Sequence, residues 1–340
     1  QASFHQGKRR QTGDGPFIQE IGMGTHLERI WLCIKNALPK SARTCIWLLK
    51  IILPISLLVR LLEYSGWLAE ISGFLSPLFS LVGLPGETAI IFITSTFGPL
   101  YAPIALITSM SLGLREATIL AIMCLVSHNL IVESSIQAKT GSSFWGMTIL
   151  RLSMSFLIAF TLNLVLPEWS GQTVGKALAA TQDTSLKEVL ILWITGSMSV
   201  IITILLIVTG LMILHNVLDE FRLMKKLSDL FAPLMKIFGL PRDAAFLWLV
   251  GNVVGLAYGG AIMVEQMQLK KLTQKEGHLL NHHLAVSHSL LEDTVIFVAI
   301  GIPALWILGT RLLFAIAVVW GRRLYNFIYS RNVIKRPLEG

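Results

Sequence analysis

Ionisable side chains occur at matched positions in two otherwise apolar stretches of this sequence. His128 is followed five residues later by Glu133, and His288 is followed five residues later by Asp293. An ionisable group at mid-depth in a bilayer costs about 2.5 to 3.5 kcal/mol on insertion scales, so such groups need a role. Imidazole nitrogens and carboxylate oxygens can bind a proton, a hydrated cation or the hydroxyl groups of a polar solute. The pattern therefore favours a binding site built from both segments.

Helical spacing decides which of these side chains can converge. Five residues turn by about 140° beyond a full circle, so His128 and Glu133 share a face only if the helix is distorted. Asn129 and Glu133 stand at i and i+4, where side chains are neighbours. His288 and Glu292 have the same spacing. Helix caps or structural hydrogen bonds are the alternative interpretation, and the repetition favours binding.

Two arginines lie at the same separation as the two histidines. Arg151 and Arg311 are 160 residues apart (311 − 151), and each falls in the last apolar span of its half. A guanidinium buried in a bundle needs a carboxylate, and Glu133 and Asp293 are the matched candidates. We expect structural charge pairing in preference to the binding of an anionic substrate.

Further candidates are less sharply defined. Tyr101 and Tyr258 follow matched glycines, where a ring can stack on a planar ligand or simply pack, and Asn252 adds a polar group to the same region. Histidines at 278, 282 and 283 have a spacing that resembles a metal site, for which His282, His283 and Glu265 are the candidate ligands. The first histidine lies among charged residues, which indicates the membrane interface and disfavours that metal site.

Composition places the chain in the membrane class. Apolar residues make up 54% and charged residues 14%, against about 25% charged residues in soluble domains. Stretches of roughly 20 apolar residues, enough to cross the bilayer as helix, recur without the alternation of barrel strands. The clearest are Cys45–Leu62, Thr88–Met110, Ala117–Val132, Phe144–Leu166, Val189–Leu214, Ala244–Met267, Leu279–Ile300 and Pro303–Trp320. We predict an all-α polytopic membrane protein with about 8 to 10 transmembrane or re-entrant helices.

The chain also contains an internal duplication. Residues 76–87 return in altered form at 232–243, and Ser-His-Asn-Leu at 127–130 returns as Ser-His-Ser-Leu at 287–290. Between these landmarks, each half has an apolar span interrupted by glycine, at Gly98-Pro99 and at Gly255. Duplication in an apolar chain is typical of transporters built from two related halves, with the site where the halves meet. Proline and glycine predict that these two spans break inside the membrane.

These repeated motifs resemble the nucleoside-recognition or Gate domain family. That family includes spore maturation proteins A and B and is similar to the membrane parts of ferrous iron transporter B and of concentrative nucleoside transporters. The resemblance covers about residues 45 to 325 and implies an integral membrane protein with a transport or transport-like role. It leaves the substrate open, and the G-protein domain of the iron transporter is absent from this sequence.

The resulting division of the chain has six parts. They are a flexible segment at 1–22, an amphipathic interfacial helix at 23–44, a first Gate-like repeat at 45–167, a linker at 168–187, a second repeat at 188–325 and a basic tail at 326–340. The net charge of +8 comes from basic residues that flank apolar spans, which marks cytoplasmic ends and argues against nucleic acid. We expect a multi-pass protein of the cell (inner) membrane with both termini in the cytoplasm.

Two segments decide the topology. If 67–83 and 223–239 both cross the membrane, the halves are inverted repeats of five crossings each; if neither crosses, they are parallel repeats of four. Charge bias favours the inverted arrangement.

We expect a transporter or carrier for a small polar solute or ion, working in the lipid bilayer as a single chain, a homo-oligomer or with a membrane partner. No nucleotide-binding, nucleophile or zinc-hydrolase motif is present, so neither a cofactor nor an enzyme is expected. The alternatives are a membrane assembly factor and, on the histidines alone, a metal-dependent hydrolase.

The first prediction concerns sidedness. Single cysteines placed in residues 171–184 should react only with reagent added outside the cell, and cysteines at Lys8, Lys271 and Lys335 only after access from the cytoplasm, because basic density differs between these segments. Cytoplasmic labelling of residues 171–184 would replace inverted halves with parallel ones.

Overall fold

The computed structural model describes residues 25–110, 112–174, 185–269 and 272–334. Most of these residues are helical and are joined by turns and loops, and they include one short antiparallel pair of strands, β1 (Leu112–Gly113) and β2 (Thr173–Val174). The predicted all-α class is therefore confirmed. The expected segment at 1–22, residues 175–184 of the linker, and Lys8, Lys271 and Lys335 lie outside the described residues.

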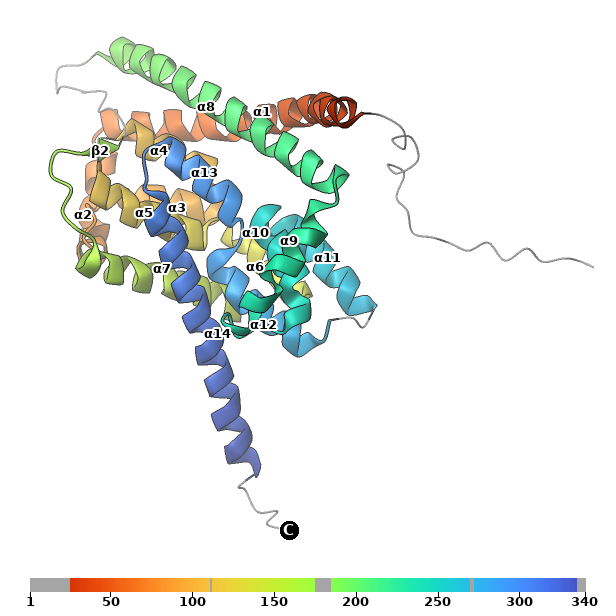
Figure 1. Ribbon diagram of the computed structural model, residues 1–340. Helices are drawn as coiled ribbons and strands as arrows, with labels where there is room; N and C mark the ends of the chain where they lie inside the picture. Colours follow the sequence, from red (N-terminus) through yellow and green to blue (C-terminus); the bar gives the residue numbers. More distant parts are fainter. Residues whose placement is uncertain (1–24, 111, 175–184, 270–271, 335–340) are drawn as a thin grey trace, which may run out of the picture.

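The helices of the described residues are divided here at residues 175–184, and Figure 1 shows their arrangement. The first half contains α1 (His26–Tyr64), α2 (Trp67–Ser80), α3 (Thr88–Phe97), α4 (Tyr101–Ser109), α5 (Leu114–Ser127), α6 (Leu130–Lys139) and α7 (Phe144–Val165). The second contains α8 (Leu186–Glu220), α9 (Leu223–Phe231), η1 (Ala232–Lys236), η2 (Arg242–Ala244), α10 (Ala245–Val253), α11 (Leu256–Gln268), α12 (Gln274–Ser287), α13 (Leu290–Ala299) and α14 (Ala304–Ile334).

Two long helices, α1 and α8, lie antiparallel across one side of the body (Figure 1). Arg29 near the start of α1 forms an ion pair with Glu220 at the end of α8, with 2.8 Å between Nε and Oε1. Further along α1, Ser41 Oγ accepts a hydrogen bond from Thr209 Oγ1 at 3.2 Å. The first helix is continuous where we expected an interfacial helix followed by a separate span, because no glycine near residue 44 ends it.

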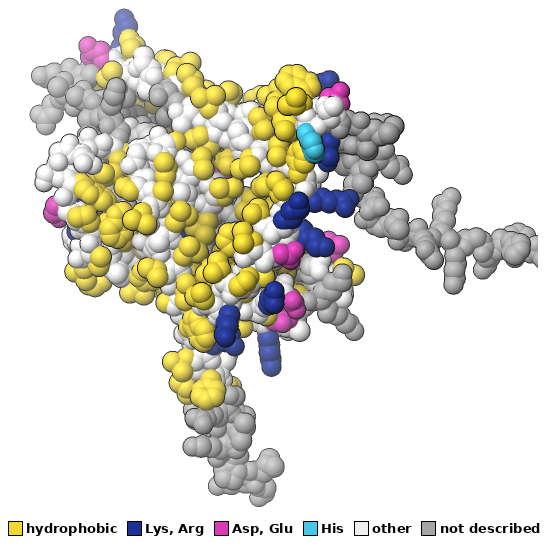
Figure 2. Space-filling model, viewed as in Figure 1, with side chains coloured by type: hydrophobic (Ala, Val, Ile, Leu, Met, Phe, Trp, Pro, Cys, Tyr) yellow, Lys and Arg dark blue, Asp and Glu magenta, His cyan; other side chains and the backbone are white. Residues whose placement is uncertain are grey.

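Within the described part of the chain, three helices are long and apolar enough to cross a membrane: α7, α8 and residues 304–329 of α14. The pair α5 and α6 would add a fourth crossing if counted as one span, although the two helices meet at an angle of 41°. Figure 2 shows apolar side chains spread over the visible face, while lysines and arginines gather in one area. An apolar exterior is what a bilayer requires.

The two spans that glycine was expected to interrupt are both broken. Between α3 and α4, Gly98 has an extended backbone with ψ of 176°. Between α10 and α11, Gly255 has φ of +97°, a conformation that glycine adopts without a steric penalty. Pairs of short helices therefore replace the continuous spans Thr88–Met110 and Ala244–Met267.

Two further breaks contradict the expected continuous spans Ala117–Val132 and Leu279–Ile300. Asn129 between α5 and α6 has φ of +47°, and Ser289 between α12 and α13 has φ of +54°. Both breaks are fixed by backbone contacts with the neighbouring broken span, at the break itself for Asn129 and within α10 for Ser289. The backbone N–H of Asn129 donates to the carbonyl of Gly98 at 3.1 Å, and that of Ser289 donates to Gly251 at 2.9 Å.

The first half is joined to α12 by a dense group of hydrogen bonds. Asn281 Nδ2 donates to the carbonyls of Gln137 at 3.0 Å and of Thr140 at 2.9 Å, and Gln137 Nε2 donates to the Asn281 carbonyl at 3.1 Å. Gly277 lies on the same side of α12, where an added Cβ would stand 2.7 Å from the Thr140 carbonyl oxygen. This junction requires glycine at position 277.

The second prediction tests that junction. Gly277→Ala should destabilise the protein by about 1 to 3 kcal/mol, because the new methyl meets a backbone oxygen that cannot rotate away. Gly210→Ala on α8 is the matched control, since its Cβ would have nothing within 4 Å. Thermal midpoints in detergent should fall for Gly277→Ala only; equal midpoints would show that the junction tolerates the methyl.

Candidate functional site

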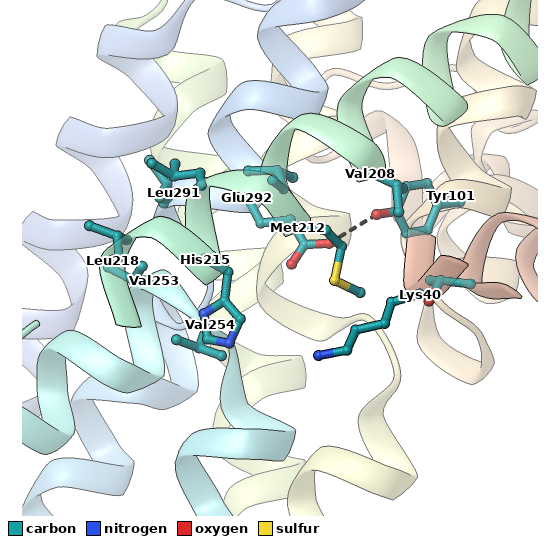
Figure 3. A pocket seen from close by; sticks show the side chains of 13 residues that line it. Lys40, Tyr101, Val208, Met212, His215, Leu218, Val253, Val254, Leu291 and Glu292 are labelled. Atoms are coloured by element: carbon teal, nitrogen blue, oxygen red, sulfur yellow. Dashed lines mark hydrogen bonds between the residues drawn. The ribbon is translucent and has the colours of Figure 1, made fainter. Parts of the chain in front are cut away.

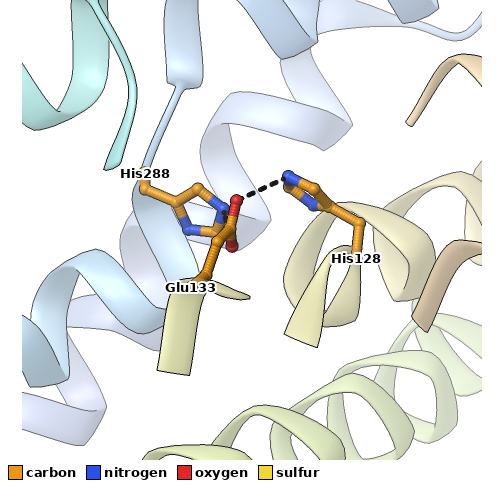
Figure 4. A group of neighbouring side chains, drawn as sticks. All are labelled: His128, Glu133 and His288. Atoms are coloured by element: carbon orange, nitrogen blue, oxygen red, sulfur yellow. Dashed lines mark ion pairs between the residues drawn. The ribbon is translucent and has the colours of Figure 1, made fainter. Parts of the chain in front are cut away.

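The centre of the molecule contains a carboxylate between two histidines (Figure 4). Glu133 Oε1 lies 3.2 Å from His128 Nε2, and Glu133 Oε2 lies 3.0 Å from His288 Nε2. The two imidazole rings are 5.0 Å apart between centroids, and all three residues are buried. His128 and Glu133 come from the first half of the chain and His288 from the second, so the halves meet at this point.

The break before α6 is what lets His128 approach Glu133. A straight helix would place residues five apart on different faces, but Asn129 has a left-handed conformation and α6 starts afresh at Leu130. His128 is the last residue before this turn, and Glu133 lies in the first turn of α6. The distortion that the spacing required is therefore present.

Arg151 on α7 binds both the carboxylate and the broken helix. Its Nη2 lies 2.7 Å from Glu133 Oε2 and donates to the His128 carbonyl at 2.7 Å. Its Nε donates to the Val126 carbonyl at 2.8 Å. Because helix ends leave carbonyls without intrahelical partners, the guanidinium completes the C-terminus of α5.

Arg311 on α14 repeats this arrangement in the second half. Its Nε donates to the Val286 carbonyl at 2.8 Å, and its Nη2 donates to the His288 carbonyl. Its Nη1 binds Asp293 Oδ2 at 2.8 Å. Every partner lies 160 residues after its counterpart in the first half.

The matched carboxylates, Glu133 in the first half and Asp293 in the second, have different partners. Glu133 contacts both histidines as well as Arg151. Among the ion pairs of the described residues, Asp293 has only Arg311. Aspartate is one methylene shorter than glutamate, so its carboxylate stays closer to the helix that carries it. The histidines consequently share a single acidic partner.

The histidines have the same backbone contact, which orients both rings. Nδ1 of His128 lies 3.0 Å from the Leu125 carbonyl, and Nδ1 of His288 lies 2.7 Å from the Leu284 carbonyl. A carbonyl oxygen only accepts, so Nδ1 carries the hydrogen in each ring. In a neutral ring, Nε2 then presents a lone pair to Glu133.

A cavity of about 350 Å³ lies between α1, α8 and α13 (Figure 3). Glu292 on α13 faces it and accepts a hydrogen bond from Tyr101 Oη at 2.9 Å. Lys40 of α1 and His215 of α8 are further polar residues of the lining. Its remaining walls are mostly apolar. Glu292 therefore binds across the halves to Tyr101, where the i, i+4 spacing suggested a contact with His288.

The other candidates lie apart from the network. Asn252 Nδ2 donates to the carbonyl of Trp248 in its own helix at 2.8 Å. His282 bonds the His278 carbonyl at 2.7 Å, and His283 bonds Ser287 Oγ at 2.7 Å. Glu265 is exposed. The side chain of Tyr258 lies outside the described residues.

The sequence reasoning missed the part of the cavity formed by α1 and α8. Lys40 and His215 belong to that wall, and neither was a candidate. The available signal was His215, an ionisable residue just after the apolar run of α8. Its importance depends on α1 lying against α8, which no local pattern predicts.

Comparison with known proteins agrees with this architecture. Residues 45–142 match the Gate family model, described as nucleoside recognition. The resemblance predicted from the repeated motifs is thereby confirmed for residues 45–142, and the apolar helices support a membrane location.

One relative extends the likeness over most of the chain. The uncharacterized membrane protein YvoD of Bacillus subtilis (strain 168) is 29% identical over 282 residues, which is 80% of this chain and 89% of that protein. No solved structure matches this chain.

The third prediction separates the ion pair of Arg151 with Glu133 from the hydrogen bonds that Arg151 donates to backbone carbonyls. Arg151→Ala should destabilise the protein by about 3 to 5 kcal/mol, because it leaves Glu133 buried without its guanidinium. Glu133→Gln combined with Arg151→Gln removes both charges and should cost less, although the carbonyls of Val126 and His128 still lose a donor. Thermal unfolding in detergent measures both. A double variant no more stable than Arg151→Ala would argue against the pair.

Proposed function

We propose that this protein is a transporter or carrier for a small polar solute or ion, with its site between two repeated halves. The observation that carries the proposal is the meeting of four broken helix pairs around buried, paired charges. Irregular backbone at membrane depth is tolerated where it is buried in protein or lines a water-filled cavity, and in transporters such broken helices form the binding site.

The two halves are, in this proposal, repeats of one ancestral unit. The helices α5, α6 and α7 begin at 114, 130 and 144, and α12, α13 and α14 begin at 274, 290 and 304. Each separation is 160 residues, and the same interval separates Asn129 from Ser289, the two histidines and the two arginines, while Gly98 and Gly255 are 157 residues apart (255 − 98). An inverted relation, with both termini in the cytoplasm of the cell, fits the charge bias of the sequence.

The cavity and the buried network are neighbours on one helix. On α13, Glu292 faces the cavity while Asp293, the next residue, pairs with Arg311. Ligand sites in proteins commonly have volumes of about 300 to 1,000 Å³ with a few polar groups on apolar walls. The cavity has this character, and its polar groups suit a small solute with hydroxyl or charged groups.

The alternative is a membrane assembly factor that transports nothing, as the resemblance to spore maturation proteins allows. The pairing of Arg151 and Arg311 with carboxylates and carbonyls favours it, because such contacts hold a structure together without any ligand. In that case substitutions in the cavity would leave the biological role intact.

The fourth prediction tests transport. Proteoliposomes containing the full chain should take up at least one labelled solute, screened over nucleosides, organic anions and divalent metals, faster than empty vesicles. Tyr101→Phe removes the hydroxyl that binds Glu292 and should lower the rate by about tenfold or more, since a hydrogen bond to a charged group contributes about 1.5 to 3 kcal/mol.

Tyr325→Phe is the matched control, because Tyr325 is exposed on the projecting part of α14. No flux above empty vesicles for any class of solute would favour the assembly factor. Equal rates for Tyr101→Phe and Tyr325→Phe would remove the cavity from the transport path.

A further inference from the structure

We propose that His128, Glu133 and His288 bind one divalent transition-metal cation. The inference goes beyond the proposed function, and rests on it only if the bound ion is also the ion carried. These are the described residues in which three ligand atoms of histidine or acidic side chains come together, all within 4.8 Å of one another. The metal would join the halves of the chain directly.

The spacing of the ligand atoms fits a small metal ion. Zn²⁺ binds imidazole nitrogen at about 2.0 to 2.1 Å and carboxylate oxygen at about 2.0 to 2.2 Å, so neighbouring ligands of a tetrahedral ion lie about 3.3 Å apart. The two Nε2 to Oε distances are 3.2 and 3.0 Å. The first distance joins His128 to Oε1 and the second joins His288 to Oε2, and the ligand atoms of the three residues all lie within 4.8 Å of one another.

The directions of the atoms favour a shared central ion over a direct hydrogen bond. His288 Nε2 and Glu133 Oε2 are 3.0 Å apart. His288 Nε2 is buried and has no hydrogen bond of acceptable geometry among the described residues, whereas Glu133 Oε2 has Arg151 Nη2 as an ion-pair partner at 2.7 Å. Buried polar atoms without hydrogen bonds are uncommon and need a partner. A cation placed between them supplies one.

The hydrogen bonds of the Nδ1 atoms in both histidines are of the kind that metal-binding histidines make. In each ring, Nδ1 bonds a backbone carbonyl, Leu125 or Leu284, and leaves Nε2 free to ligate. Such a second contact fixes the ring and raises its basicity. Arg151 fixes the orientation of the Glu133 carboxylate through Oε2, and a carboxylate has about four lone-pair directions, so it can bind a guanidinium and a metal together.

Charge and ligand type narrow the choice of ion. Glu133, Asp293 and Glu292 supply three carboxylates near two guanidiniums, so a cation is better accommodated than an anion. Two imidazoles select Zn²⁺, Co²⁺, Ni²⁺ or Fe²⁺ over Mg²⁺ and Ca²⁺, which prefer oxygen. Three protein ligands leave a fourth position for water or a solute, as in sites where the metal exchanges or reacts.

The experiment measures metal binding by the full chain, purified in detergent without a polyhistidine tag. The protein is stripped with a chelator, loaded with Zn²⁺ or Co²⁺, desalted and analysed for metal. Wild type should retain about one ion per chain, the stoichiometry of one three-ligand site. His288→Gln and His128→Gln should each weaken Co²⁺ affinity at least about tenfold, by loss of a ligand. The same loss should remove the visible absorption of bound Co²⁺.

His282→Gln is the matched control, because His282 is also buried on α12 but bonds the His278 carbonyl outside the group. It should keep wild-type stoichiometry and affinity. Elution profiles and metal-free thermal midpoints establish that each variant is folded, and Glu133→Gln provides a second loss of ligand.

The outcomes are separable from those of the transport assay. No stoichiometric metal in wild type, or wild-type affinity in both His288→Gln and Glu133→Gln, overturns the metal site and leaves a group that can bind only protons. Retained metal binding with no flux of any solute overturns transport alone. Uptake that persists without metal binding overturns the metal site alone.

Discussion

Free backbone carbonyls at the ends of α5 and α12 are the constraint on which the rest of this structure depends. A helix that stops inside a dry core leaves carbonyl oxygens that water cannot reach, at a cost of several kcal/mol for each unsatisfied group. Arg151 and Arg311 meet this need by donating to the carbonyls of residues 126 and 128, and 286 and 288. The breaks can exist because the arginines are there.

The arginines in turn determine where the acidic residues lie. A buried guanidinium requires a counter-charge, and the first turns of α6 and α13 supply Glu133 and Asp293. Once Glu133 is held by Arg151, both histidines can reach it, because each is the first residue beyond a completed helix. The helix breaks, the buried ion pairs and the group of two histidines around Glu133 therefore depend on one another, and none can be altered alone.

Much of this could be predicted from the sequence. The breaks at Gly98 and Gly255 follow from residue type, and the partners of Arg151 and Arg311 from matched positions. The breaks at Asn129 and Ser289 could not be predicted, because neither glycine nor proline marks them and tertiary hydrogen bonds fix them. The cavity could not be predicted either, because its walls are formed by several helices and no local sequence pattern encodes how those helices pack. That Glu133 serves both histidines depends on one methylene and on the direction of α6.

The adjacency of Glu292 and Asp293 on α13 has a mechanical consequence. Successive residues of a helix are rigidly connected, separated by about 100° of rotation and 1.5 Å of rise. A solute that drew Glu292 away from Tyr101 would turn the same short helix that holds Asp293 against Arg311. A change at the cavity wall is therefore transmitted to the core through α13. This helix connects the contact between Glu292 and Tyr101, which can open, with the ion pair between Asp293 and Arg311, which must stay closed.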